Sequence, residues 1–179
     1  VWSQCRDIAR EAVVSSSWQM TTKAVMEVSG YGGTGFLAKE LVQDLLHTPL
    51  FQTWDPEQGL WAPHSCWDIN DWCAVGPGAR RGLNRLKGRK VSWSAYVTGD
   101  RIHTMFLGEL QELFKQRHEY WGQSIEGEAA FELELHDVQF QLCEMDKYER
   151  ERLKPGAVRV YEPPSTWAPA PSAHCSAAS

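Results

Sequence analysis

Hydrophobic residues recur every three or four positions in three long stretches of this chain, which is the spacing of one face of an α-helix. In the first stretch the spaced residues are Phe36, Leu37, Leu41 and Leu45, and Pro49 ends the pattern. In the second, over residues 100–120 with Asp100 as the N-cap, they are Ile102, Phe106, Leu110, Leu113 and Phe114. In the third, over residues 137–153, they are Val138, Leu142, Met145 and Tyr148. This pattern predicts a mainly α-helical fold.

Shorter segments complete this picture without changing the fold class. Residues 6–14 and 21–29 have helical character, and residues 51–70 are typical of a long loop, rich in tryptophan and turn-forming residues. Residues 91–97 alternate loosely, as a short strand or an extended connection would, and residues 131–135 fit a strand and a helix equally well. We therefore expect at most a short strand or two.

The chain is long enough for one domain and too short for two of ordinary size. We divide its 179 residues into an N-terminal docking segment (1–24), a helical domain (25–160) and an extended tail (161–179) rich in Pro, Ala and Ser. A tail of this composition cannot form a core of its own, so we expect it to contact a protein partner. Nine tryptophans are spread along the chain; we expect most of them to be core or interface anchors, with exposed ones at partner surfaces.

Cysteine content and hydropathy restrict the protein class further. Five cysteines, an odd number without a repeated C-x-x-C, favour reduced, buried thiols and an intracellular reducing compartment. No hydrophobic run approaches the roughly 18 residues that span a bilayer. His64, Cys66 and Cys73 match no zinc-ribbon or zinc-finger spacing. The sequence therefore predicts no membrane span, no metal site and no cofactor.

Charge is concentrated in one segment. The chain has a net charge of −5, yet residues 73–99 contain no acidic residue; their basic residues are Arg80, Arg81, Arg85, Lys87, Arg89 and Lys90. Gly76-Pro77-Gly78 forms a tight turn in front of a helix, and the free N–H groups at a helix start bind phosphate. We expect segment 76–90 to contact the sugar-phosphate backbone of a nucleic acid, as a helix-hairpin-helix does. The alternative is a pair of helices that meet at a glycine turn and expose their basic side chains to solvent.

A second glycine cluster lies at residues 30–35. Gly30 and Gly35 have the G-x-x-x-x-G spacing of a phosphate loop, but Phe36 and Leu37 stand where that loop needs Lys and Ser or Thr. The segment is therefore not that of a P-loop kinase. It is either a turn that lets two helices pack closely, or a loop through which Tyr31 and Gly32 approach a ligand.

A third group of candidate residues lies on the last predicted helix. Glu144, Lys147 and Tyr148 fall within about one turn of each other, and Asp137 lies near the start of the helix. Charged residues on the inner face of an apolar helix are site candidates, whereas the same residues on the outer face are ordinary solvated charges. The spacing leaves both interpretations open.

Taken together, these motifs resemble one known family. They are, in chain order, GYG at 30–32, DW at 71–72, GPGARRGLNRL at 76–86, HDV at 136–138 and CEMDKYER at 143–150. Over residues 25–152 the chain is similar to the helical domain of phage thymine-hypermodification proteins. That family is known as the α-glutamyl/putrescinyl thymine pyrophosphorylases, and also as the helical domain of 5-hydroxymethyl-deoxyuridine DNA kinases.

The resemblance implies an all-helical, DNA-glycosylase-like fold that acts on a modified thymine in DNA, where an amine displaces a pyrophosphorylated hydroxymethyl group. It implies a base pocket, an anion site and a proton-transfer group. Gly76, Gly78, Arg80, Arg81 and Arg85 would hold the pyrophosphate, and Tyr31 would position the base. Asp71, Asp137, Glu144 or Lys147 would transfer protons or orient the pocket. If the chain is an enzyme, it would be a DNA-base-modifying transferase.

Two other function classes remain possible on the sequence. A non-catalytic relative would serve as a structural or nucleic-acid-binding subunit of a large assembly, and the many tryptophans and the tail favour that class. A plain protein-interaction module with an acidic surface is the other. An enzyme should gather Tyr31, Gly78, Arg81 and Glu144 around one open pocket.

Overall fold

The protein is described here from a computed structural model, which covers residues 2–62, 64–117, 119 and 133–154. Its helices are α1 (Trp2–Ser15), α2 (Trp18–Met26), α3 (Phe36–Leu45), α4 (Pro77–Leu86), α5 (Asp100–Lys115) and α7 (Leu135–Leu153). Two short antiparallel strands, β1 (Trp54–Asp55) and β2 (Leu60–Trp61), form a hairpin in which Trp54 faces Trp61. The prediction of a mainly α fold with a short strand or two is confirmed.

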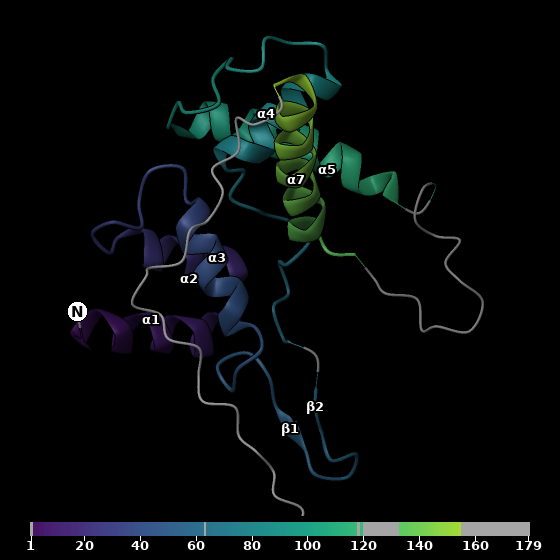
Figure 1. The fold of residues 1–179 in the computed structure, drawn as a ribbon. Coiled ribbons are helices and arrows are strands. Elements are labelled where there is room, and N and C mark those ends of the chain that lie inside the picture. Colours follow the sequence, from purple (N-terminus) through teal and green to yellow (C-terminus); the bar gives the residue numbers. More distant parts are fainter. Residues whose placement is uncertain (1, 63, 118, 120–132, 155–179) are drawn as a thin grey trace, which may run out of the picture.

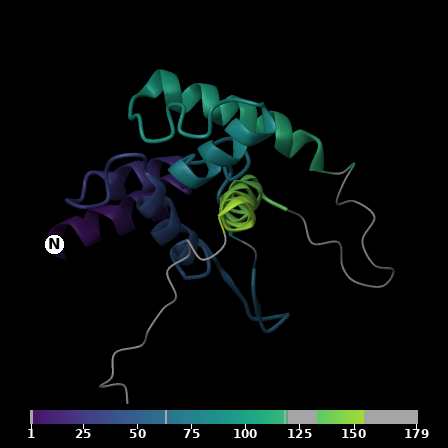
Figure 2. The same ribbon diagram turned by 45° about the horizontal axis from the view of Figure 1, so that its top comes forward.

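The helices form two groups in space. Figure 1 shows α1, α2 and α3 together on one side, α4, α5 and α7 on the other, and the β1–β2 hairpin projecting away from both. In Figure 2 α7 is viewed nearly along its axis while α5 runs across the picture, so the two helices cross steeply. In the segment that links the groups, residues 64–76 are mostly without regular structure.

Each group has its own hydrophobic core. In the first, Trp18, Val25 and Val42 are almost fully buried, together with Phe51 and Trp72 from the loops. In the second, Leu83 of α4, Phe106 and Leu110 of α5 and Leu135 and Leu142 of α7 pack together. Because α2 carries core residues of the first group, residues 18–24 are part of the folded unit as well as of the predicted docking segment.

Close packing of α4 on α7 depends on two glycines. A Cβ on Gly78 would lie 2.8 Å from Cys143 Sγ, and a Cβ on Gly82 would lie 2.6 Å from the Leu142 carbonyl oxygen. No larger residue fits at either position without moving α7. Residues 72–76, directly before α4, form neither a helix nor a turn. The structure therefore shows a glycine-mediated helix pair and does not confirm a helix-hairpin-helix.

Three details of the predicted pattern are wrong. The buried face of α3 consists of Ala38, Lys39 and Val42, whereas Leu37 is 58% exposed. Lys39 is buried because its ammonium group has polar partners there, Gln139 at 3.0 Å and Gln43 at 3.1 Å, besides an ion pair with Glu40. Tyr148 points outward from α7, with 66% of its surface exposed. The N-cap of α5 is Gly99, and Asp100 is the first helical residue.

The tryptophans divide between core and surface. Trp18 and Trp72 are buried, whereas Trp54, Trp61, Trp67 and Trp93 are 40% or more exposed. Trp18 and Trp72 are therefore core residues, and an interface role for the exposed tryptophans stays a prediction. Trp121, Trp167 and the 161–179 tail lie outside the described residues. Among the described helices, none has the length and hydropathy of a membrane-spanning segment.

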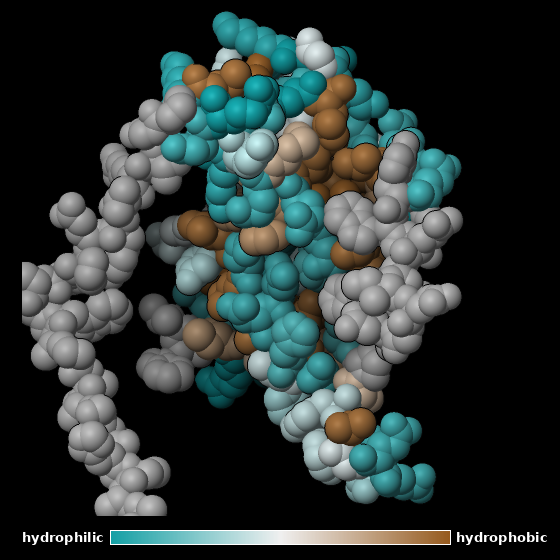
Figure 3. Space-filling view, turned by 45° about the vertical axis from the view of Figure 1, so that its right-hand side comes forward, coloured by the Kyte–Doolittle hydropathy of each residue, from teal (hydrophilic) through white to brown (hydrophobic). Residues whose placement is uncertain are grey.

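An apolar groove of about 370 Å³ lies where α4, α5 and α7 meet. Its hydrophobic lining residues are Leu86, Leu113, Val138, Leu142 and Met145. Figure 3 shows hydrophobic residues gathered in the upper half of this face, beside the mostly hydrophilic surface of α7.

Candidate functional site

A pocket of about 360 Å³ lies where the two helix groups meet, and it is the candidate functional site. Five segments supply its walls: α2, the glycine loop before α3, the residues around Trp72, α4 through Arg80, and the start of α5 with the residues before it. Its lining residues are Gln19, Lys23, Met26, Gly33, Thr34, Trp72, Ala74, Arg80, Thr98, Gly99, Asp100, His103, Thr104 and Leu107. We call it the α2–α5 pocket.

Arg80 is the buried cation of this pocket, with 1% of its surface exposed. Its guanidinium donates from Nε to the Val75 carbonyl at 2.7 Å and from Nη1 to the Val97 carbonyl at 2.6 Å, and it lies 5.2 Å from the centre of the Phe106 ring. Burial lowers the pKa of Arg80 from its usual value. Within the described part of the chain, the ion pairs of the basic segment include none for Arg80. Its positive charge is therefore not neutralised by a carboxylate.

The opposite walls carry further polar groups and an aromatic ring. The His103 ring lies 5.6 Å from that of Trp72, and burial together with Arg80 lowers the pKa of His103 from its usual value. With its amide turned so that the oxygen faces these donors, Gln19 accepts hydrogen bonds from Lys23 Nζ at 3.0 Å and from Trp72 Nε1 at 3.1 Å. Asp100 contributes one acidic group to the lining. The pocket thus combines positive charge, hydrogen-bonding groups and the aromatic ring of Trp72.

The glycine loop forms one edge of the pocket. Gly30, Gly33 and Gly35 have positive φ angles of 96°, 76° and 74°, which only glycine adopts at no cost. Gly33 and Thr34 line the pocket; Tyr31 is 36% exposed and does not. The packing use of this loop has structural support, since Gly35 lies against Met26. Tyr31 and Gly32 do not line the pocket, and a ligand contact for them stays a prediction.

The predicted anion cradle at the start of α4 is occupied by other parts of the protein. A Cβ on Gly76 would lie 2.6 Å from the Phe36 ring. The Ala79 N–H, near the start of α4, hydrogen-bonds to Cys143, whose thiol pKa is raised by burial. The structure gives Gly76 and Gly78 a packing role. A phosphate contact at these glycines stays a prediction.

Two of the predicted phosphate-binding arginines share one buried carboxylate. Asp146 of α7 is fully buried and accepts from Arg81 Nε at 2.7 Å and from Arg85 Nε at 3.1 Å. Arg150 adds a third cation at 3.4 Å, so the cluster keeps a net positive charge. Arg81 also donates to the Tyr96 hydroxyl at 2.7 Å. These arginines therefore connect α4 to α7, and a phosphate contact for them stays a prediction.

The rest of the basic segment is also largely paired. Arg89 binds Glu109 with both carboxylate oxygens, at 2.7 and 2.6 Å, and Lys87 lies 3.5 Å from Glu112. Both acids lie on α5. The segment that is continuously basic in the sequence is thus neutralised mainly by acids from α5 and α7.

The four residues predicted to be catalytic are not gathered around the pocket. Asp71 is exposed at the surface, and Asp137 accepts the Glu134 N–H at 2.8 Å in the N-terminal capping box of α7. Glu144 pairs with Lys147 on the outside of α7. None of them lines the α2–α5 pocket. A catalytic role for Asp71, Asp137, Glu144 and Lys147 stays a prediction.

The sequence indicated Arg80 and the glycine loop as site residues. It did not indicate that Lys23, Trp72 and His103 line the pocket. Lys23 and His103 are single polar residues on amphipathic helices, so no motif distinguishes them. For Trp72 the one available signal was that the DW motif at 71–72 belongs to the motifs that carry the family resemblance.

Burial raises the pKa of the Cys66 thiol and of the Cys73 thiol to about 12 in each case, helped at Cys66 by Asp68. Lys39 opposes the effect at Cys73. Cys66, Cys73 and Cys143 are buried free thiols, as predicted, whereas Cys5 is exposed and Cys175 lies outside the described residues.

Comparison with known families places the chain in one of them. The sequence matches the family described as "5-hmdU DNA kinase, helical domain" over residues 8–157. Comparisons with curated proteins and with solved structures found no significant match. The matched region begins inside α1 and so reaches further toward the N-terminus than the resemblance found in the sequence motifs. This match does not separately support the pyrophosphorylase assignment in that resemblance. The chain belongs to the 5-hmdU DNA kinase helical-domain family.

Proposed function

We propose that this chain is a DNA-binding helical domain of a thymine-hypermodification system, and that the α2–α5 pocket receives one nucleotide of the DNA. The family match supplies the DNA context. The observation that carries the proposal is Arg80, a buried guanidinium in the pocket wall whose hydrogen-bond partners are carbonyl groups. An uncompensated buried cation favours an anionic ligand.

The pocket suits a nucleotide in size and in chemistry. Its volume of about 360 Å³ falls within the range of small-ligand pockets. Lys23 and Arg80 complement a phosphate, and Trp72, Met26 and Leu107 offer apolar contact to a base. A base in a duplex must leave the stack to enter such a pocket, as it does in enzymes that modify bases.

We assign DNA binding to the domain and do not assign phosphoryl transfer to its described residues. The glycine loop has Phe36 and Leu37 at the positions where a phosphate loop needs its lysine and hydroxyl. Of the predicted catalytic residues, Asp137 takes part in helix capping, and Glu144 and Lys147 form a surface ion pair. In a transfer assay with labelled ATP and 5-hmdU DNA, the chain alone should therefore give no product, whereas product formation would overturn this assignment.

Fluorescence anisotropy of the full chain with labelled oligonucleotides tests the binding. Lys23→Gln removes an exposed cation of the pocket, and Lys115→Gln removes an exposed lysine at the far end of α5. We expect Lys23→Gln to weaken binding and to reduce the salt slope by about 0.9 for a lost duplex phosphate contact, or about 0.7 for single-stranded DNA. Lys115→Gln should leave the slope unchanged.

Substrate preference is measured by comparing 5-hmdU with thymine at the same position, in single strands and in mismatched duplexes. We expect tighter binding of the modified base where it is already unstacked. Absence of salt-dependent binding, or equal effects of the two lysine variants, would refute the pocket assignment. Charge reversal at Arg80 or Arg81 is a poor test, because it would also break bonds that hold the fold together.

A second candidate function, a non-catalytic subunit of a larger assembly, is favoured by one observation. Trp54 and Trp61 pair edge to face on the β1–β2 hairpin, 5.4 Å apart, and are 47% and 48% exposed. Exposed aromatic pairs are typical of interface anchors. Recovery of the native protein in a stoichiometric complex, with loss of that complex on Trp61→Ser, would favour this candidate.

A further inference from the structure

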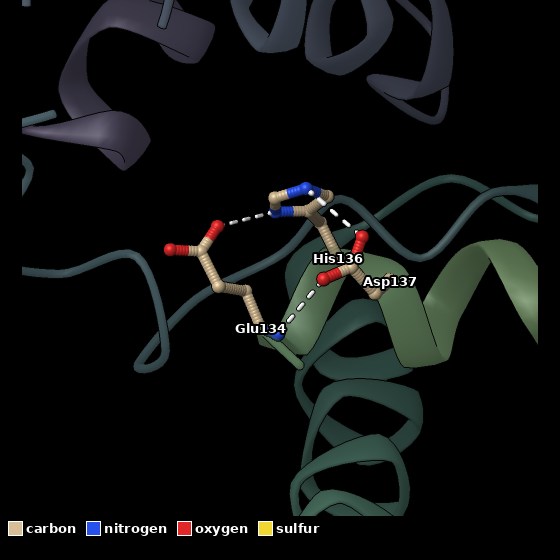
Figure 4. A group of neighbouring side chains, drawn as sticks. All are labelled: Glu134, His136 and Asp137. Carbon is tan, nitrogen blue, oxygen red and sulfur yellow. Dashed lines mark hydrogen bonds and ion pairs between the residues drawn. The ribbon is translucent and has the colours of Figure 1, made fainter. Parts of the chain in front are cut away.

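The N-terminus of α7 carries a group of histidine and carboxylate side chains that the proposed function does not use. Glu134, His136 and Asp137 each present a ligand atom, and these atoms lie within 4.8 Å of one another. His64, from the segment after β2, adds a fourth side chain, with its Nε2 2.7 Å from Glu134 Oε1. Figure 4 shows the Glu134 and Asp137 carboxylates on either side of the His136 ring.

His136 is insufficiently paired within the protein itself. It is 6% exposed, it stacks on Trp18 with ring centres 5.5 Å apart, and its Nδ1 is buried without a hydrogen bond. The nearest carboxylate atom to Nδ1 is Glu134 Oε2 at 3.4 Å. A buried polar atom without a partner is destabilising, so the group lacks an interaction that a ligand would supply.

The spacing matches that of ligands to one metal ion. Two ligand atoms about 2.1 Å from a tetrahedral zinc ion lie about 3.4 Å apart, and the Glu134–His136 pair is at 3.4 Å. His64 Nε2, beside Glu134, is a further donor, whereas Asp137 Oδ1 lies 3.4 Å from His136 Nε2, on the other side of the ring. Imidazole with carboxylate suits zinc-like transition-metal ions, whereas Mg²⁺ and Ca²⁺ prefer oxygen ligands alone.

We propose that Glu134, His136 and His64 form a binding site for one divalent transition-metal ion of the zinc type, at the junction of α7, α2 and the segment after β2. Asp137 lies on the other side of the His136 ring and orients it. The metal lies on the Nδ1 side of His136, against Glu134. His64 exchanges its hydrogen bond to Glu134 for coordination, and Asp137 Oδ2 keeps its capping bond to the Glu134 N–H. The site joins the two helix groups and is separate from the residues of the α2–α5 pocket.

Calorimetric titration of Zn²⁺ into the metal-stripped, tag-free full chain tests this site, with Co²⁺ absorption as the coordination probe. We expect one ion per chain and a rise in Tm on zinc addition. Glu134→Gln and His64→Gln remove ligands that are 25% and 16% exposed, so both variants should fold. Each should weaken zinc binding by about tenfold or more. His47→Gln, at an exposed histidine on the chain after α3, is the matched control and should bind as the wild type does.

Three outcomes would overturn the proposal. The first is the absence of saturable binding by Zn²⁺ or Co²⁺. The second is equal affinity in the wild type, Glu134→Gln and His64→Gln. The third is a Co²⁺ spectrum with intense thiolate charge-transfer bands, which would assign the metal to cysteines. DNA binding through Lys23 is measured separately, so failure of either assignment leaves the other testable.

Discussion

Arg81 of α4 donates from Nε to Oδ2 of Asp146 on α7 at 2.7 Å, and Asp146 is completely buried. Two motifs that the sequence analysis treated as separate parts of a binding site, GPGARRGLNRL and CEMDKYER, are therefore two sides of one helix interface. Arg85 completes the contact from the next turn of α4. The charged residues of these motifs therefore hold α4 against α7.

Replacing Asp146 by Asn should destabilise the protein strongly. The variant leaves Arg81 and Arg85 half-buried without a counter-charge, and breaking a buried pair in this way costs about 3–5 kcal/mol. Urea denaturation measures the free energy of unfolding. Glu144→Gln, which removes a carboxylate from a surface pair on the same helix, should cost no more than about 1 kcal/mol. Equal losses in the two variants would contradict the assigned role of Asp146.

Alanine at two helical glycines should change stability in opposite directions. In Gly82→Ala the new methyl group would lie 2.6 Å from the Leu142 carbonyl oxygen, and overpacking of this kind costs about 1–3 kcal/mol. In Gly108→Ala of α5 the new Cβ meets no atom within 4 Å, so the higher helix propensity of alanine should stabilise by about 0.5–1 kcal/mol. Thermal unfolding of both variants gives the sign, and stabilisation by Gly82→Ala would refute the close packing of α4 on α7.

Stability should fall as the pH is lowered from about 7.5 to 5.5, and His103 should contribute to the fall. Burial and Arg80 lower the pKa of His103 in the folded state, while the unfolded chain keeps the ordinary value of about 6.5. Below that pH the unfolded state binds more protons, so acid favours unfolding. His136, whose pKa is also lowered by burial, acts in the same direction. Denaturation at both pH values should show a smaller fall for His103→Gln, and an identical fall would contradict the role of His103.

The cysteines should differ sharply in reactivity toward a thiol reagent. Cys5 is exposed on α1, whereas Cys66, Cys73 and Cys143 are buried with raised pKa values. Because the thiolate is the reacting form, the buried thiols should react at least about a hundredfold more slowly than Cys5 at pH 8. A Cys175→Ser background removes the cysteine outside the described residues. Addition of urea should make the three protected thiols react, and fast labelling in native buffer would show that the core opens.

The sequence by itself determined the fold class and much of the element order. Phe106, Leu110 and Phe114 recur at helical spacing and are buried as the pattern predicts, because the period of an α-helix is a local property. The same holds for Val138 and Leu142 on α7. The face of α3 was missed since Lys39 is buried by partners that include Gln139, a hundred positions away.

Only the tertiary structure decided where the charges act. A run of basic residues indicates an anion, but the sequence cannot show that Asp146, Glu109 and Glu112 fold against that run and neutralise most of it. Lys23, Trp72 and His103 meet at one pocket for the same reason: they belong to segments that become neighbours only when the two helix groups pack together. Helical periodicity depends on residues that are neighbours in the sequence, whereas ion pairing and pocket formation depend on contacts between residues far apart in it.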